Sequence, residues 1–180
     1  MELTELLGSS FDCACSRHHT VPTEEFIYGE NSFGAIPRLI DTYSPQKRCL
    51  IIADRRTYGA AGQEIEALCE TSGVRCDHFI VPDIGDESPV VDDRTRDVLV
   101  KQITDPGLLI AVGSGVINDL VKWAAFLQDK PYIVAATAAS MNGYGSANVA
   151  ATLDGRKVLF HAAAPKAGLA RPGGLSNAPA

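Results

Sequence analysis

Two glycines flank a serine where an apolar run at residues 108–112 meets a helical pattern at residues 116–127. The three residues are Gly113, Ser114 and Gly115. This order places free backbone N–H groups and the positive end of a helix dipole beside a turn with little side-chain bulk. The pyrophosphate of a nucleotide binds to such groups, but a glycine turn can also serve only to bend the chain. The motif alone leaves both interpretations open.

The residues that follow exclude one class of nucleotide enzyme. A phosphate-binding loop of an NTPase needs a longer glycine spacing that closes on Lys and Ser or Thr, whereas Gly115 is followed by Val116 and Ile117. The ordinary dinucleotide fingerprint differs too, because it has a third glycine where this chain has Asn118 and lies in the first strand-to-helix turn. We therefore expect nucleotide binding without kinase or GTPase chemistry.

A second strand end carries charged residues. Asp54 follows the apolar run 49–53, where its carboxylate can accept hydrogen bonds from an adenosine ribose or can cap the helix expected from residue 57. Arg55 and Arg56 come next, and a guanidinium there can bind the extra phosphate of NADP. The cofactor thus stays open between NAD and NADP.

A third strand end leads into the loop TAASMNGYGS, residues 137–146. Its small donors and acceptors suit a nicotinamide amide or a polyol. The alternative is a plain turn, in which Asn and Gly supply backbone conformations with positive φ.

The three strand ends belong to a pattern of alternating strands and helices, which predicts an α/β fold. We expect a Rossmann-like parallel sheet with helices on both faces, and a C-terminal β-hairpin at residues 149–161. Ligands of such sheets bind outside the carboxyl ends of the strands. Strands are expected at 25–28, 49–53, 76–81, 108–112 and 132–136, and helices at 33–40, 57–72, 90–103 and 116–127. We expect residues 1–180 to be a single N-terminal nucleotide-binding domain, with a strand or hairpin in segment 1–24 and an irregular tail at 164–180.

Composition limits the partners. The chain has 180 residues, 46% hydrophobic content and a formal charge of −6. That charge argues against a nucleic-acid surface, which requires clustered Lys and Arg. No run of about 18 apolar residues could span a bilayer, and the N-terminus lacks a secretory signal. We expect a cytoplasmic protein.

The five cysteines favour free thiols over disulfides. Three of them lie within expected strands and helices, as suits buried thiols in a reducing cytoplasm: Cys49, Cys69 and Cys76. Cys13 and Cys15, with His18 and His19 close behind, have the side chains that zinc prefers. Their spacing of one residue is shorter than the usual two to four, which favours an N-terminal strand or hairpin there over a metal site.

Two segments together, AVGSGVINDLVKWAAF and PYIVAATAASMNGYGSANVAA, resemble the sn-glycerol-1-phosphate dehydrogenase group of the glycerol dehydrogenase, 3-dehydroquinate synthase and iron-containing alcohol dehydrogenase superfamily. The similarity runs over nearly the whole chain. It implies an NAD(P)-dependent oxidoreductase of phospholipid metabolism that converts dihydroxyacetone phosphate to sn-glycerol 1-phosphate with the help of zinc or a similar divalent metal.

The resemblance also assigns roles by position. Asn142 corresponds to a substrate-contacting position at which the family usually has Asp, so the phosphorylated polyol or ketone that this chain accepts stays open. Lys157 is expected to be an exposed hairpin lysine. By position, the pyrophosphate loop is resembled by Gly113, Ser114, Gly115 and Asp119, and the nicotinamide-side contacts by Thr137, Ser140 and Ser146. Together with Asp54, expected from its place after a strand, and Asn118, these are the expected cofactor-binding residues.

Members of the family continue into a helical second domain that supplies one Asp and two His metal ligands. This sequence ends at Ala180, before the first of them is due, and has Arg171 and Pro172 where Asp and Leu are expected. We therefore expect a truncated form with no catalytic residue or metal ligand in this chain, weak dinucleotide binding without turnover, and homo-oligomers formed through uncovered apolar surface. The alternatives are a non-catalytic nucleotide-binding or interaction module and a 3-dehydroquinate synthase-like lyase, which TAASMNGY disfavours.

Overall fold

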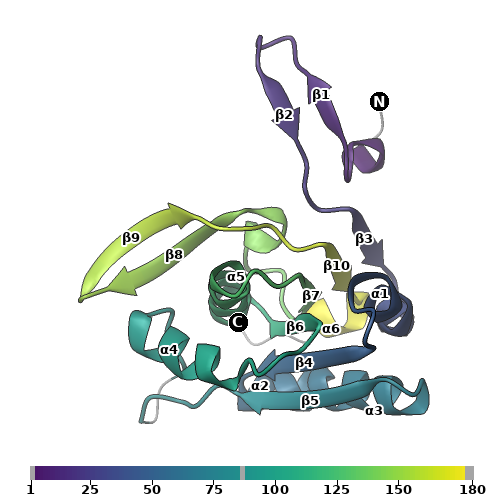
Figure 1. Cartoon of the computed structure of the whole chain (residues 1–180), viewed down its shortest axis with the longest axis vertical. Coiled ribbons are helices and arrows are strands. Elements are labelled where there is room, and N and C mark those ends of the chain that lie inside the picture. The colour runs from purple at the N-terminus through teal and green to yellow at the C-terminus, as the bar shows by residue number, and fades with distance from the viewer. Residues whose placement is uncertain (1–2, 86–87, 177–180) are drawn as a thin grey trace.

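The computed structural model describes residues 3–85 and 88–176, and its centre is a parallel sheet of six strands (Figure 1). All neighbours in this sheet run parallel. In spatial order the strands are β3 (Glu25–Tyr28), β10 (Ala167–Ala170), β7 (Tyr132–Ala136), β6 (Leu108–Gly113), β4 (Arg48–Ala53) and β5 (Arg75–Ile80).

Helices cover both faces of the sheet because the strands are apolar on both sides. On β4, Ile51 packs with α1 (Ile36–Tyr43) and α3 (Gln63–Thr71), whereas the next residue, Ile52, packs with α4 (Asp93–Gln102) and α5 (Gly115–Leu127). The predicted Rossmann-like fold is confirmed. Among the described helices, none combines the length and apolar content needed to cross a membrane.

The chain changes face between β4 and β6. The connection from β4 to its outer neighbour β5 passes through α3 on one face, and the connection from β6 to β7 passes through α5 on the other. Neighbouring strands whose connections leave in opposite directions create a crevice at their carboxyl ends, where ligands of open α/β sheets bind. The crevice here lies between the residues that follow β4 and β6.

The predicted helices form, with shifted starts. The segment expected from residue 57 is a continuous helical run of α2 (Arg55–Thr57), a π-helical turn η3 (Tyr58–Gly62) and α3. The helix expected from residue 90 begins only at Asp93, because Asp92 has an extended backbone and its carboxylate accepts a hydrogen bond of 2.8 Å from the N–H of Thr95. A 3-10 turn η2 (Ser32–Ala35) precedes α1, and another, η1 (Leu3–Leu6), lies near the N-terminus.

Two antiparallel hairpins flank the sheet. The predicted C-terminal hairpin, β8 (Asn148–Leu153) with β9 (Arg156–His161), lies over α4 and α5 in Figure 1 and packs on Trp123. Lys157 is exposed on it, as predicted. The N-terminal segment forms a hairpin of β1 (Ser10–Asp12) and β2 (His18–Thr20), which projects from the body at the top of Figure 1.

The prediction of an irregular tail at residues 164–180 is wrong. Residues 167–170 form β10, which lies inside the sheet between β3 and β7, and α6 (Pro172–Ser176) follows; residues 177–180 lie outside the described part. The sequence AGLA has no β-branched residue and is too short to show a periodicity. It becomes a strand because it pairs with the strands on both sides. Gly168 leaves room for the ring of Phe26, since a Cβ there would lie 2.1 Å from that ring as it is placed.

Replacement of Leu169 by Ala tests the place of β10. Leu169 is 1% exposed, so Leu169→Ala should lower the free energy of unfolding by about 2–5 kcal/mol in urea denaturation. Leu159 on β9 is 71% exposed and offers a matched control whose replacement by Ala should change that free energy by less than about 0.5 kcal/mol. Equal small effects of both substitutions would contradict a buried strand at 167–170.

Candidate functional site

The polar strand ends singled out in the sequence lie along one edge of the sheet. In the strand register, Ala53 is opposite Val112, and Gly113 is opposite Ala136. The residues that follow these strands, Asp54, Ser114 and Thr137, therefore come to the same carboxyl edge. The crevice at the change of face opens between the first two.

The start of α5 offers unoccupied backbone donors. Ser114 is the N-cap residue and its side chain makes no capping hydrogen bond, while the first helical bond runs from the N–H of Asn118 to the Ser114 carbonyl at 2.9 Å. Within the described part of the chain, the N–H groups of Gly115, Val116 and Ile117 have no hydrogen-bond acceptor. Such a helix start binds anions.

The two glycines have different roles here. A Cβ on Gly113 would lie 2.7 Å from the Cβ of Ile117, so this glycine lets the first turn of α5 pack directly on the end of β6. A Cβ on Gly115 would meet only the Sδ of Met141, at an ordinary 3.7 Å. Gly115 thus leaves open space at the helix start without being needed for packing.

A buried lysine holds the loop that follows β7. Lys122 on α5 is 0% exposed, and its Nζ donates to the carbonyls of Gly143 at 3.1 Å and Asn148 at 2.9 Å. It also lies 3.3 Å from Oδ1 of Asp119. Burial lowers the pKa of Lys122, and the neighbouring Asp119 carboxylate opposes that shift. The ammonium thus joins α5 to both ends of the segment 143–148.

Two further side chains brace the same loop. Asn118 is fully buried and its Nδ2 donates to the Gly143 carbonyl at 3.4 Å, while its Oδ1 has no hydrogen-bond partner among the described residues. Tyr144, in the 3-10 turn η4 (Gly143–Gly145), donates its hydroxyl to the Ala138 carbonyl at 2.6 Å. Burial raises the pKa of Tyr144 to about 12. These bonds brace the loop against α5 and against its own first residues.

An apolar groove of about 250 Å³ lies beside the braced loop, at the carboxyl ends of β7 and β10. Met141 links it to the start of α5, since its Sδ approaches the Gly115 position. A flat, mostly apolar ring suits such a groove. Its walls include Phe26, Val134, Ala136, Met141, Tyr144 and Leu169.

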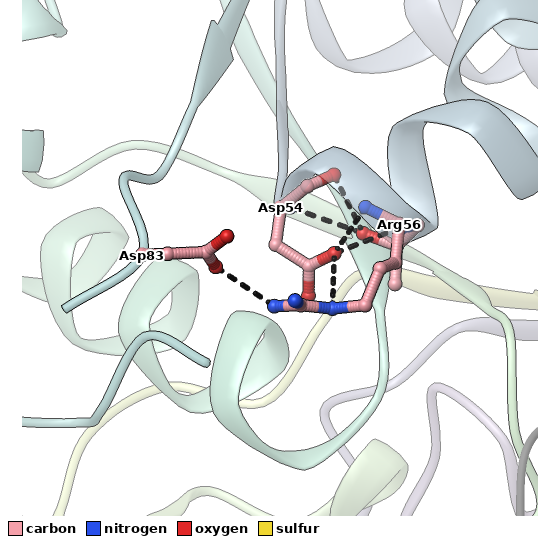
Figure 2. A network of polar contacts seen from close by, with 4 residues as sticks. Asp54, Arg56 and Asp83 are labelled. Carbon is pink, nitrogen blue, oxygen red and sulfur yellow. Dashed lines mark hydrogen bonds and ion pairs between the residues drawn. The ribbon is translucent and has the colours of Figure 1, made fainter. Parts of the chain in front are cut away.

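At the other end of the crevice, Asp54 caps a helix and takes part in an ionic network (Figure 2). Its Oδ1 accepts from the N–H groups of Arg56 and Thr57 at 2.8 and 2.9 Å, so the N-cap alternative is confirmed. The guanidinium of Arg56 lies 3.6 Å from the same Oδ1 and donates to Asp83 at 2.8 Å. Arg56 therefore faces two carboxylates, and Oδ2 of Asp54 takes no part in these bonds.

The structure separates the sequence-predicted residues into three groups. Gly113, Ser114, Gly115 and Thr137 meet at the carboxyl edge, and Ser140 and Asn142 are exposed on the loop. The remaining four have local partners. Asp54 caps α2, and Asn118 braces the loop. Asp119 accepts from the N–H of Ala150 at 3.2 Å, and the Ser146 hydroxyl accepts from the N–H of Asn148 at 3.0 Å. Ligand contact by any of them stays a prediction.

Sequence reasoning missed Lys122, Tyr144 and Asp83. The sequence did contain a signal for Lys122. It lies three residues after Asp119 and four after Asn118, so the three side chains form a polar stripe on an otherwise apolar helix. The contact between Arg56 and Asp83 joins residues from two strand ends, so no local pattern could indicate it.

No three-ligand metal set lies at this edge among residues 3–85 and 88–176. In those residues, two groups of His, Cys, Asp and Glu side chains are close enough to share an ion, and both lie away from the edge. They are Cys13 with Cys15 and His19, and Cys49 with Cys69 and Cys76. The remaining histidines are placed elsewhere too, since His78 on β5 pairs with Glu66 at 2.7 Å and His161 ends β9. These residues do not fit a catalytic metal beside the crevice.

Comparisons with known proteins agree on one family. The family model of iron-containing alcohol dehydrogenase matches residues 27–179. The glycerol-1-phosphate dehydrogenase (NAD(P)+) of Bacillus velezensis is 29% identical over 180 residues, covering 97% of this chain and 44% of that protein. The enzyme of the same name from Bacillus subtilis is 31% identical over 161 residues, covering 88% and 40%.

A solved structure shows the same fold. Glycerol dehydrogenase from Schizosaccharomyces pombe superposes with a TM-score of 0.74 at 18% identity, over 87% of this chain and 39% of that one. The chain spans less than half the length of the curated relatives that it matches.

Substitutions at the two glycines should separate packing from ligand access. Gly113→Ala should lower the free energy of unfolding by about 1–3 kcal/mol, because the new Cβ overlaps Ile117. Gly115→Ala should leave that free energy unchanged or higher, since alanine favours helices over glycine by about 1 kcal/mol.

Gly115→Ala should nevertheless weaken NADH binding about tenfold, a loss of about 1.4 kcal/mol, by filling the space at the helix start. Denaturation and fluorescence titration of both variants would check this, and unchanged NADH affinity in Gly115→Ala would contradict the assignment.

Proposed function

The chain belongs to the iron-containing alcohol dehydrogenase family, and from this membership we propose that residues 1–180 form the dinucleotide-binding part of an NAD(P)-dependent sn-glycerol-1-phosphate dehydrogenase. The observation that carries the proposal is the open row of N–H groups at the start of α5, in the crevice where the chain changes face. In the proposed reaction, dihydroxyacetone phosphate takes a hydride from NAD(P)H and a proton, giving sn-glycerol 1-phosphate and NAD(P)+. The names of the curated relatives support this substrate and cofactor class.

The proposed cofactor pose follows the edge of the sheet. The pyrophosphate binds the N–H groups of Gly115, Val116 and Ile117, and the adenosine ribose donates to Oδ2 of Asp54. The nicotinamide ring occupies the apolar groove beside Met141, within reach of the loop hydroxyls. Binding thus needs little rearrangement, because the loop is already braced from α5.

The binding of substrate and of metal involves groups other than those that bind the cofactor. Asn142, which is exposed on the loop, is the proposed substrate contact, and its neutral amide can donate to a phosphate or hydroxyl oxygen. A family metal, when bound, supplies a Lewis acid for the carbonyl. Since the described edge residues do not fit that metal, we assign it no step here and propose that residues 1–180 alone do not turn over substrate.

We also propose a cytoplasmic location and self-association. Cys49 and Cys69 are buried free thiols, which a reducing compartment preserves. On the edge strand β3, Phe26 and Tyr28 are exposed, and an unpaired apolar strand edge favours contact with a second copy.

The cofactor preference should respond to Asp83. In Asp83→Asn, Arg56 loses one of its two carboxylate partners and becomes free to bind the 2′-phosphate of NADPH, so the ratio of NADPH to NADH affinity should rise about tenfold, about 1.4 kcal/mol. Asp97→Asn is a matched control, because Asp97 also pairs with an arginine, Arg96, but on α4. Titration of both cofactors would check this; an unchanged ratio would show that Arg56 does not face the ribose.

The function is tested by binding and turnover. NADH or NADPH should bind the chain weakly, and absorbance should show no oxidation of NADH with dihydroxyacetone phosphate. A fusion of this chain to the C-terminal part of the Bacillus velezensis relative, supplied with a divalent metal, should then catalyse the reaction. Binding without turnover in the fusion would favour the non-catalytic module, and no binding of either dinucleotide would refute both.

A further inference from the structure

The N-terminal hairpin has almost no core of its own. Its strands β1 and β2 have three residues each, most side chains between Ser10 and Thr20 are exposed, and the hairpin projects from the body in Figure 1. A two-stranded hairpin in water is only marginally stable. Small units without a sufficient core are commonly stabilised by a disulfide or a metal.

The turn of this hairpin brings three metal-binding side chains together. The Sγ atoms of Cys13 and Cys15 and a ring nitrogen of His19 all lie within 4.8 Å of one another. The Sγ of Cys15 is 3.1 Å from Nε2 of His19. Ligands of tetrahedral zinc lie about 3.3–3.8 Å apart, given bond lengths of about 2.0–2.3 Å. Small side-chain rotations bring the three atoms to that spacing.

The backbone explains how a spacing of one residue can work. The N–H of Ser16 donates to the Cys13 carbonyl at 2.9 Å, and the N–H of Cys13 donates to the Arg17 carbonyl at 3.0 Å. Ser16 has a positive φ of 64°, which turns the chain sharply after Cys15. The turn therefore returns Cys15 towards the second strand.

The strands place the third ligand on the same face. His19 is paired with Phe11 in the register, and Cys13 is two residues after Phe11, so both project on its side of the hairpin. The rings of Phe11 and His19 pack with centroids 5.7 Å apart, which orients the imidazole.

We propose that Cys13, Cys15 and His19 bind a zinc ion that stabilises the β1–β2 hairpin, with water as the fourth ligand. Two thiolates and a neutral imidazole balance the charge of Zn²⁺, and binding releases two thiol protons to solvent. The site goes beyond the bare hairpin expected from sequence and is independent of the dehydrogenase function.

The second thiol cluster is unsuited to this role. Cys49 and Cys69 are 2% and 0% exposed and lie in the apolar core, where three thiolates around Zn²⁺ would leave an unpaired negative charge. Neutral thiols fill such a place as small apolar groups.

The adjacent histidine gives a matched control. His18 lies on the opposite face of β2, where its Nδ1 is 2.9 Å from Oδ1 of Asp12. It has the same side-chain chemistry as His19, but it pairs with Asp12 and is not among the side chains that cluster with the two thiols.

Metal titration of the reduced, chelator-treated 180-residue chain tests the proposal. One Co²⁺ per chain should bind with thiolate-to-cobalt absorption, and Zn²⁺ should displace it. Cys13→Ser, Cys15→Ser and His19→Ala should each weaken zinc binding at least about a hundredfold, since even loss of an outer-shell partner costs about 10–100-fold. His18→Ala and Cys69→Ala should keep the affinity of the unmodified chain.

Limited trypsin digestion gives a second readout. Zinc should slow cleavage after Arg17 in the unmodified chain and in His18→Ala, and should have no effect in Cys15→Ser. Equal loss of binding in His18→Ala and His19→Ala, loss only in Cys69→Ala, or no stoichiometric binding would each overturn the proposal.

Discussion

The candidate site depends on the buried ammonium group of Lys122. A charge removed from water costs several kcal/mol unless it is paired and hydrogen-bonded. Lys122 meets that requirement with acceptors from three parts of the chain, the Asp119 carboxylate and the carbonyls of Gly143 and Asn148. Because moving the loop would take away two of the three acceptors of a buried charge, the loop after β7 keeps its position relative to α5. The groove and the open start of α5 are thereby fixed to one another.

The sheet supplies the rest of the geometry. The register brings three strand ends to one level, and the change of face between β4 and β6 opens a crevice where α5 begins. Gly113 lets that helix approach the strand closely. A negatively charged ligand there gains from backbone donors and the helix dipole, neither of which requires a particular side chain. Similar folds can therefore retain such a site while their sequences diverge.

The sequence predicted the features that local patterns encode. The apolar runs at β4, β6 and β7 and the glycine motif before α5 identified the fold and the edge at which polar residues meet. Strand β10 was missed because AGLA is defined by its neighbours rather than by its own propensity. The sequence could not predict the direction of single side chains. Asp119 faces β8, and Arg56 binds Asp83, which is distant in sequence.

The central claim is that a diphosphate binds the first N–H groups of α5. Backbone NMR of the isotope-labelled chain during titration with NADH tests it directly. The amide resonances of Gly115, Val116 and Ile117 should shift most, with the downfield changes typical of hydrogen bonding, and inorganic pyrophosphate should reproduce these changes. Shifts confined to other parts of the chain, with these three amides unchanged at saturating NADH, would contradict it.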